Sequence, residues 1–176
     1  MKLKGQDVLL VLKLLSDGGR KGTFAALAEA LGISASEAHA ALGRAREAGL
    51  VHPLEDRAIK ASVAEFLLHA IKYAFPVKPG GATRGMPTGF AAPPLNHNFR
   101  SEVREGFIWV WPDPEGNQGG LEIKPLCRSV PAAARRDASL YEWLVLADVL
   151  RGAGRARERE LAASVVKERL GGHADS

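Results

Sequence analysis

Residues 23–60 constrain the fold more than any other part of this chain, because they form the pattern of two short helices joined by a tight turn. Leu27 lies one helical turn before Leu31 on an apolar face, and Gly32 follows where the turn needs a backbone conformation that a side chain would resist. A second helix is expected over residues 34–48. Small residues on the facing sides allow the two helices to cross closely, so the segment predicts a helix-turn-helix.

A small wing is expected directly after the second helix. Gly49 ends the helix, and Leu50 and Val51 start a short strand. Residues 55–57 then turn the chain, and residues 58–60 return it as a second strand. Two short strands joined by a polar turn at this point of the chain are typical of a wing.

The pattern from residue 27 to residue 51 resembles the winged helix-turn-helix domains of bacterial regulators, in particular the MarR-like and ArsR-like groups. The residues that carry the resemblance are Leu27, Ala28, Leu31, Gly32, Ile33, Ser34, Ser36, His39, Leu42, Ala48, Gly49, Leu50 and Val51. It covers roughly residues 5–75 and implies a DNA-binding transcription regulator, usually a dimer. Gly43 departs from the pattern, since glycine inside a helix costs up to ~1 kcal/mol relative to alanine. Either the helix is weak there, or the glycine lets the backbone approach something such as a phosphate.

In such domains the second helix lies in the DNA major groove, with its N-terminal half against the base edges. Four residues face the core by helical spacing: Ala38, Ala41, Leu42 and Ala45. On the opposite face, Ser36, His39 and Ala40 are the candidates for base contact. Arg44 is the candidate for contact with a phosphate or with guanine, which arginine can bind bidentately. The alternative interpretation is a solvated polar face with ordinary charges.

Phosphate contacts are expected from segments on either side of this helix. Arg20, Lys21 and Thr23 precede the first helix of the pair, where such folds meet the DNA backbone, and Thr23 is the expected N-cap of that helix. Arg57 and Lys60 belong to the predicted wing. Carboxylates beside them would face phosphates, so the wing is expected to contribute little. The complete predicted DNA-binding set is Arg20, Lys21, Thr23, Ser34, Ser36, His39, Ala40, Gly43, Arg44, Arg46, Arg57 and Lys60.

Composition places the chain among ordinary soluble proteins. The 176 residues include 24 Lys and Arg against 20 Asp and Glu, and the net charge of +4 is weak support for a nucleic-acid partner. The single cysteine, Cys127, excludes an internal disulfide and a cysteine-cluster zinc site. Charged Lys13 interrupts the N-terminal apolar run, and no stretch approaches the ~20 apolar residues that a membrane span needs. We therefore expect a cytoplasmic protein with no membrane partner.

The remaining helices are predicted from apolar spacing and capping patterns. Residues 6–16 form a helix that is apolar on both sides, and one side belongs to the helix-turn-helix core. The other side needs the C-terminal region or a second subunit. Ser-x-x-Glu, a pattern in which the two side chains satisfy free backbone donors, occurs as Ser34 with Glu37, Ser62 with Glu65 and Ser139 with Glu142. Further helices are expected over residues 62–74, 140–150 and 155–170.

The C-terminal half has a different composition. Residues 76–105 are dense in glycine and proline and have no period, so they are expected to form an irregular linker or loop. Residues 106–125 indicate a β-hairpin, since two strand-like segments flank the turn-forming PDPEGNQGG. We therefore predict a winged helix-turn-helix domain over 1–75, a linker over 76–105, and a hairpin with two helices over 106–176. The last part is expected to serve dimerisation or partner binding.

The sequence contains no pattern typical of catalysis. The five histidines are scattered without metal-binding spacing, and phosphate-loop and nucleophile-elbow motifs are absent. His97 is interpreted as a loop histidine, and Arg84 as a linker residue, a minor-groove arm or a partner site. The aromatic residues Phe107, Trp109, Trp111, Tyr141 and Trp143 are expected in a core or subunit interface, with base stacking or a small-molecule pocket as the alternative. We expect no catalytic residue, metal or cofactor.

The expected fold is mainly α (α+β): a winged helix-turn-helix followed by a β-hairpin and two helices. The expected function is sequence-specific binding of double-stranded DNA by a homodimeric transcription regulator, with residues 35–48 in the major groove, rather than enzymatic catalysis. One alternative is an antitoxin-like or adaptor protein that binds a partner protein through its C-terminal half, with DNA binding serving autoregulation. Another is a regulator whose C-terminal aromatic residues form an effector pocket.

Overall fold

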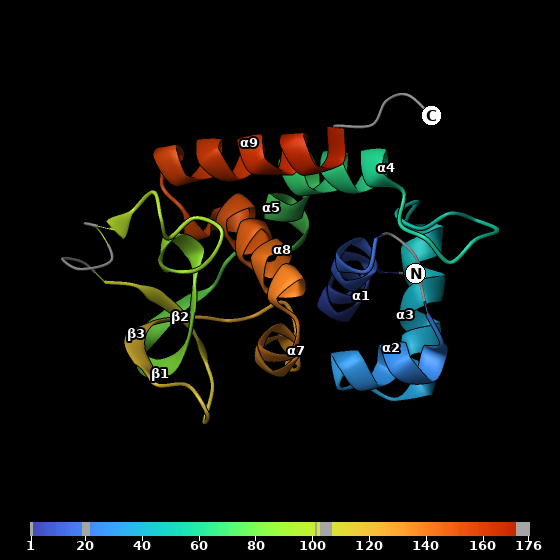
Figure 1. Cartoon of the computed structure of the whole chain (residues 1–176), viewed down its shortest axis with the longest axis horizontal. Helices are drawn as coiled ribbons and strands as arrows, with labels where there is room; N and C mark the ends of the chain where they lie inside the picture. Colours follow the sequence, from blue (N-terminus) through green and yellow to red (C-terminus); the bar gives the residue numbers. More distant parts are fainter. Residues whose placement is uncertain (1, 19–21, 101, 103–106, 172–176) are drawn as a thin grey trace. The chain divides into compact units, whose positions relative to one another are not determined.

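A computed structural model describes residues 2–18, 22–100, 102 and 107–171 (Figure 1). These residues form helices and a three-stranded sheet, in agreement with the expected mixed, mainly helical fold. The chain divides into two compact units. The helical unit comprises Met1–Phe66 and Leu126–Leu144, and the sheet unit comprises Leu67–Pro125 and Val145–Ser176. The predicted boundaries at residues 75 and 105 therefore differ from the observed ones, because residues 126–144 return to the N-terminal part.

The helical unit is built around α1. Its helices are α1 (Gly5–Ser16), α2 (Phe24–Leu31), α3 (Ala35–Glu47), α4 (Lys60–Glu65), α7 (Val130–Arg136) and the first part of α8 (Ala138–Asp148). Helix α1 packs against both α2 and α3. All of its larger apolar side chains are buried, namely Val8, Leu9, Leu10, Val11, Leu12, Leu14 and Leu15. The expected two-sided apolar helix is therefore present.

The returning segment also contacts α1, which decides how its second side is covered. A Cβ at Gly5 would lie 1.8 Å from the carbonyl oxygen of Leu126, so the two backbones approach as closely as glycine allows. At the other end of α1, Nζ of Lys13 lies 2.7 Å from the carboxylate of Asp137. Both apolar sides of α1 are thus buried within one chain, and the helix gives no reason to require a second subunit.

The capping patterns predicted two helix starts correctly and two wrongly. Thr23 caps α2, and Ser34 with Glu37 forms the expected reciprocal cap of α3. Helix α4 begins two residues before Ser62, because Ile59 already supplies the first helical carbonyl to the N–H of Val63. Helix α8 begins before Ser139, because the carboxylate of Asp137 accepts from the N–H of Leu140. In both cases an earlier group satisfies the helix start.

The predicted wing is reduced to one antiparallel bridge, between Val51 and Ala58. Two backbone hydrogen bonds flank it, from the N–H of His52 to the carbonyl of Arg57 and from Ile59 to Leu50. Lys60, expected in the second wing strand, is instead the first residue of α4. The return strand is short because the chain turns into the helix directly after the bridge.

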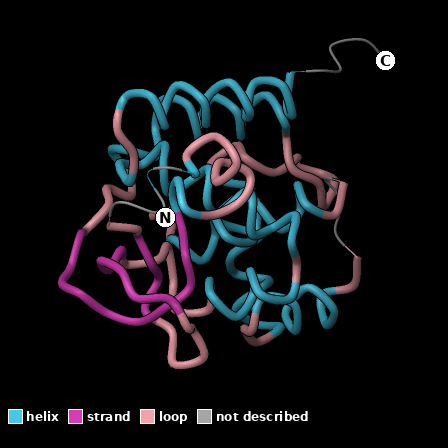
Figure 2. The backbone as a smooth tube through the Cα atoms, turned by 60° about the vertical axis from the view of Figure 1, so that its left-hand side comes forward, coloured by secondary structure: helices cyan, strands magenta, loops and turns pink. Residues whose placement is uncertain are grey.

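The sheet unit corrects the two predictions made for the C-terminal half. Residues expected to be irregular contain β1 (Pro79–Thr88), and the expected hairpin contains β2 (Trp109–Pro112) and β3 (Gln118–Ile123). β2 and β3 do not pair as an antiparallel hairpin. Each pairs antiparallel with β1, β2 with residues 85–88 and β3 mainly with residues 82–85, and they pair parallel with each other. The three strands close on themselves, as the magenta segments of Figure 2 show.

Glycine explains why β1 was not predicted as a strand. A Cβ at Gly85 would lie 1.8 Å from the carbonyl oxygen of Trp111, so only glycine allows β2 to cross at this point. Gly85 pairs with Pro112 on one side and with Gln118 on the other. Glycine in a strand often marks a close backbone approach, but without knowledge of the partner strands the same residue indicates a loop.

Helices of the sheet unit are joined to the strands by a buried polar network. The carboxylate of Asp148 accepts from Thr88 at 2.6 Å, from the indole N–H of Trp111 at 2.7 Å and from Arg151 at 2.8 Å. The Arg151 guanidinium also donates to the carbonyls of Phe75 and Lys124. Buried polar groups destabilise a fold unless they are paired, and here each of these groups has a partner. The network therefore joins β1 and β2 to the C-terminal end of α8.

Two helices that begin in the helical unit and continue into the sheet unit contain π-helical turns. The helix that starts as α4 continues through one at Phe66–Ala70 into α5 (Ile71–Ala74), as far as the predicted end at residue 74. Helix α8 continues through another at Val149–Ala153. Helix α9 (Ala156–Gly171) follows, close to the expected range 155–170, and it buries Ala162 and Val166.

Candidate nucleic-acid interface

The turn between α2 and α3 adopts the geometry that its sequence indicates. Gly32 has φ of 67°, in the left-handed region that favours glycine, and the N–H of Ile33 donates to the carbonyl of Ala28. At the start of α3, the N–H of Glu37 donates to Oγ of Ser34 at 3.1 Å, and the N–H of Ser34 donates to the Glu37 carboxylate at 2.8 Å. The start of α3 is therefore fixed by two reciprocal hydrogen bonds between Ser34 and Glu37.

One face of α3 is a buried seam and the other is exposed, as helical spacing predicted. The buried residues are Ala38, Ala41, Leu42 and Ala45. Ser36, His39 and Ala40 are exposed on the N-terminal half. The ring of His39 stacks on Phe24 of α2, with ring centroids 3.5 Å apart and an interplanar angle of 17°. The imidazole is thus held in one orientation, with an edge available to a ligand.

Arg44, the predicted contact for a phosphate or for guanine, is bound in this structure to a buried carboxylate of α1. Its guanidinium donates two hydrogen bonds of 2.8 Å to the carboxylate of Asp7, which is completely buried. The bond to Asp7 raises the pKa of Arg44 further above its already high value. Helical spacing could not reveal this partner, because Asp7 comes from α1, 37 residues earlier.

The other two arginines near α3 also have acidic partners. Arg46 donates to the carbonyl of His52 at 3.0 Å and to the carboxylate of Asp56 at 2.7 Å. Arg57 pairs with Glu55 within the turn of the wing. The two carboxylates that were expected to oppose DNA phosphates therefore neutralise the neighbouring arginines, and Arg46 attaches the wing to the C-terminal part of α3.

The remaining predicted residues have different surroundings. Arg20 and Lys21 lie outside the described residues. The Thr23 hydroxyl accepts from the N–H of Ala26 as the cap of α2, while Lys60 is exposed. Within the described part of the chain, no atom outside the backbone of α3 lies within 4 Å of a Cβ built on Gly43, so packing does not require glycine there.

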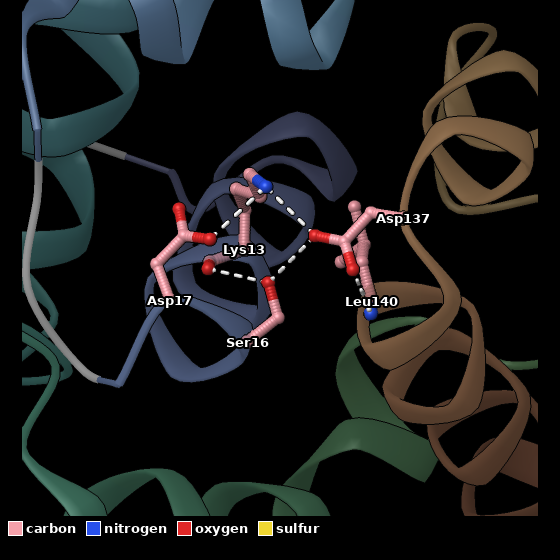
Figure 3. Close-up of polar contacts among 5 residues, drawn as sticks. All are labelled: Lys13, Ser16, Asp17, Asp137 and Leu140. Carbon is pink, nitrogen blue, oxygen red and sulfur yellow. Dashed lines mark hydrogen bonds and ion pairs between the residues drawn. The ribbon is translucent and has the colours of Figure 1, made fainter.

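A polar cluster at the end of α1 was not predicted from the sequence (Figure 3). Lys13 lies between Asp17, at 3.1 Å, and Asp137, at 2.7 Å, and the hydroxyl of Ser16 also reaches Asp137. Burial acts to lower the pKa of Lys13, but its bonds to the two carboxylates outweigh burial and raise it. Burial likewise acts to raise the pKa of Asp137, and the bonds from Lys13 and from the N–H of Leu140 lower it instead. The cluster joins α1 to the start of α8 through contacts between residues 121 and 124 positions apart in the chain.

The aromatic residues of the C-terminal half serve several purposes rather than one. Trp111 and Trp143 are buried, as expected for core packing. Burial raises the pKa of Tyr141 to about 12. Trp109 is half-buried, whereas Phe107 is 79% exposed. Phe107, Trp109 and Trp111 belong to the sheet unit, and Tyr141 and Trp143 belong to the helical unit, so the aromatic residues expected as one set are divided between the units.

The two polar residues noted in the segment 76–105 have ordinary environments. Arg84 lies exposed on β1 rather than in a loop, and exposed His97 contacts the guanidinium of Arg100 at 3.4 Å. Among the described residues, no three His, Cys, Asp or Glu side chains are grouped closely enough to hold a metal ion. In the same part of the chain, no helix has the length and apolar character to cross a membrane. Comparisons with protein-family models, curated proteins and solved structures found no match.

Proposed function

We propose that the helical unit is a winged helix-turn-helix DNA-binding domain and that the protein is a sequence-specific transcription regulator. The observation that carries the proposal is the N-terminal half of α3. Its exposed face presents Ser36, His39 and Ala40, while the opposite face is a buried seam of small residues. The helix start is held by the reciprocal bonds of Ser34 and Glu37. In this fold class such a half-helix enters the major groove.

The three exposed residues offer different kinds of base contact. The Ser36 hydroxyl can donate or accept a hydrogen bond, and the methyl group of Ala40 can contact the methyl group of thymine. His39 presents a ring edge that Phe24 already holds in place. A fixed side chain loses less rotamer freedom on binding than a mobile one. We therefore assign His39 the largest share of base recognition.

The electrostatic contribution to this binding is small. Arg44, Arg46 and Arg57 are each paired with a carboxylate, so they add little net attraction to phosphates. Contacts with phosphates then fall to Arg20, Lys21 and Lys60. Three neutralised phosphates give a slope of about −3 in a plot of log K against log salt. Two copies on a palindromic site supply the specific affinity that one sparsely charged module lacks.

Lys21→Ala measures this electrostatic part. Removal of one phosphate contact is expected to reduce the magnitude of the salt slope by about 1 for each copy and to weaken binding to all sequences equally. Fluorescence anisotropy with a labelled duplex at several salt concentrations measures both quantities. An unchanged slope would remove Lys21 from the interface.

The proposal is tested by selection from a random DNA pool, followed by binding of the selected duplex. We expect enrichment of a palindromic motif, with half-sites about 10–10.5 base pairs apart or a multiple of this distance. His39→Ala should weaken binding by about tenfold, which corresponds to about 1.4 kcal/mol. His69→Ala is the matched control, because His69 is an exposed histidine outside the helical unit. Failure to enrich any motif, or equal binding by the two variants, contradicts the proposal.

A second candidate function is the binding of a partner protein through the C-terminal half. It is favoured by Tyr73 of the sheet unit, which is 78% exposed and lies with its ring under the ammonium group of Lys72. Exposed tyrosine beside a cation is typical of interface residues. Co-expression with the product of a neighbouring gene should then yield a stoichiometric complex that Tyr73→Ser weakens. A complex that forms equally well with Tyr73→Ser rules out this surface.

A further inference from the structure

The sheet unit contains a cavity that the proposed function does not use. Its volume is about 580 Å³, within the range of small-molecule sites. The apolar part of its wall consists of the side chains of Phe90, Phe107, Trp109 and Leu121. Phe107 is 79% exposed and Trp109 is half-buried, so two aromatic side chains that line this cavity keep surface that the protein core does not cover.

Part of the cavity wall is backbone held in a special conformation. Residues 152–154, at the end of the π-helical turn Val149–Ala153, line the cavity. Gly152 has φ of 133°, which strongly favours glycine. The turn is anchored by the buried ion pair of Arg151 with Asp148. This part of the wall is therefore fixed by a glycine conformation and by a buried ion pair.

The position of the Trp109 indole is also restricted by the backbone of Gly89. Gly89 has φ of 68°, and a Cβ built on it would lie 3.3 Å from Cδ1 of the Trp109 indole. The indole thus lies close to the backbone of Gly89, where even a Cβ would make a tight contact. One flat aromatic surface is therefore held in place beside the cavity before any ligand arrives, which reduces the entropy lost on binding.

An acidic side chain provides the polar end of the cavity. Glu158 is only 6% exposed and lines the cavity, and one of its carboxylate oxygens accepts from the backbone N–H of Arg155 at 2.8 Å. Among the described residues, no Lys, Arg or His side chain forms an ion pair with it. Glu102, a second acidic residue of the wall, pairs with exposed Arg157 at 3.4 Å. Buried carboxylates are normally paired, so Glu158 is available to a cation.

We propose that this cavity binds a flat aromatic cation that carries amino groups. The cationic ring system stacks on Trp109 beside Phe107, and an amino group donates hydrogen bonds to the carboxylate of Glu158. Tryptophan is the best side chain for attracting a cationic ring system, and a carboxylate adds a charge-assisted bond. An anionic ligand is disfavoured because it would meet Glu158 without a cation in place. The site does not depend on DNA binding by the helical unit.

The test uses three tricyclic probes of similar size and different charge, with protein free of nucleic acid. Proflavine is cationic at pH 7, acridone is neutral, and acridine-9-carboxylate is anionic. Isothermal titration calorimetry should show saturable binding of proflavine, with acridone bound at least about tenfold more weakly and the carboxylate more weakly still. Equal affinity for the three probes, or no binding of proflavine, overturns the proposal.

Glu158→Gln separates a ligand contact from a structural role. The amide oxygen of glutamine can still accept from the N–H of Arg155, so the helix start is kept while the charge is removed. We expect proflavine to lose about tenfold in affinity and acridone to be unaffected. Glu168→Gln, an exposed position on the same helix, is the matched control and should bind like the parent protein. Trp109→Ala should weaken both probes, and a Glu158→Gln variant that binds proflavine like the control contradicts the assignment.

Discussion

Replacement of Arg44 by methionine tests whether this side chain stabilises the helical unit rather than contacting DNA. Its guanidinium makes two hydrogen bonds of 2.8 Å to Asp7, which is 0% exposed. After the replacement, the carboxylate keeps the bond from the backbone N–H of Lys4, at 2.7 Å. A buried negative charge would therefore remain near the start of α1 without its cation.

The expected magnitude follows from the burial of both partners. Breaking a buried ion pair by removing one partner destabilises a protein by about 3–5 kcal/mol, since the other charge stays buried and uncompensated. The side chain of Arg44 is itself only 10% exposed, so solvent screens the pair weakly. The bond from Lys4 and the partial positive charge at the N-terminus of α1 offset part of the penalty. We therefore expect a loss of about 3 kcal/mol, equivalent to a decrease of about 1–2 M in the urea midpoint.

Urea unfolding at pH 7, followed by far-ultraviolet circular dichroism, measures this loss. Arg57→Met is the matched control, because Arg57 and its partner Glu55 are both exposed and such pairs contribute about 0–1 kcal/mol. The double variant Asp7→Asn with Arg44→Met removes the uncompensated charge and should recover part of the stability. If Arg44→Met is as stable as Arg57→Met, the reasoning is refuted. A stable Arg44→Met protein with weakened DNA binding would restore the role that helical spacing predicted.

Three further predictions concern other parts of the chain. The bonds of Asp137 lower its folded-state pKa, so their contribution to stability is present above its ordinary value of 3.8 and is lost as the pH falls through the lower folded-state value. Asp137→Asn should therefore be about 1–3 kcal/mol less stable than the parent at pH 7, and pH-dependent urea unfolding should show the difference shrinking below 3.8. Gly85→Ala places a Cβ 1.8 Å from a carbonyl oxygen of β2 and should destabilise the sheet by about 3 kcal/mol or more, whereas Gly119→Ala, with no atom within 4 Å, should be tolerated in the same thermal unfolding experiment. Burial of Tyr141 predicts that a Tyr73→Phe protein, which retains one tyrosine, forms its phenolate near pH 12 in an absorbance titration, against about 10 in urea. A midpoint near 10 in the folded protein would contradict that burial.

Local features of the helical unit could be predicted because neighbouring residues decide them. The caps at Thr23 and Ser34 satisfy donors three residues away, and the left-handed turn at Gly32 depends on that residue alone. The apolar seam of α3 follows from a period of 3.6 residues. The candidate base-contacting residues were found by the same rule, as the side opposite the seam.

Interactions between distant residues were not predicted, and they changed the candidate site most. Arg44 and Arg46 are two residues apart in α3, and their acidic partners, 37 and 10 residues away, leave neither guanidinium as a net positive charge. Sequence spacing indicates which side of α3 a residue faces but not which carboxylate the fold brings to it. For the same reason, Asp137 was not recognised as the partner of Lys13.

The amino-acid sequence alone determined the helix-turn-helix segment and its exposed face, because hydrogen bonds and apolar contacts a few residues apart specify them. Only the tertiary structure decided that β1 is a strand, that β2 and β3 are parallel, and that the arginines near α3 are paired. Each of these depends on which backbone or charge comes close after folding. Glycine at position 85 is compatible with a loop and with a strand that passes close to another backbone. Only the close approach of the Trp111 backbone shows that the second alternative is the correct one.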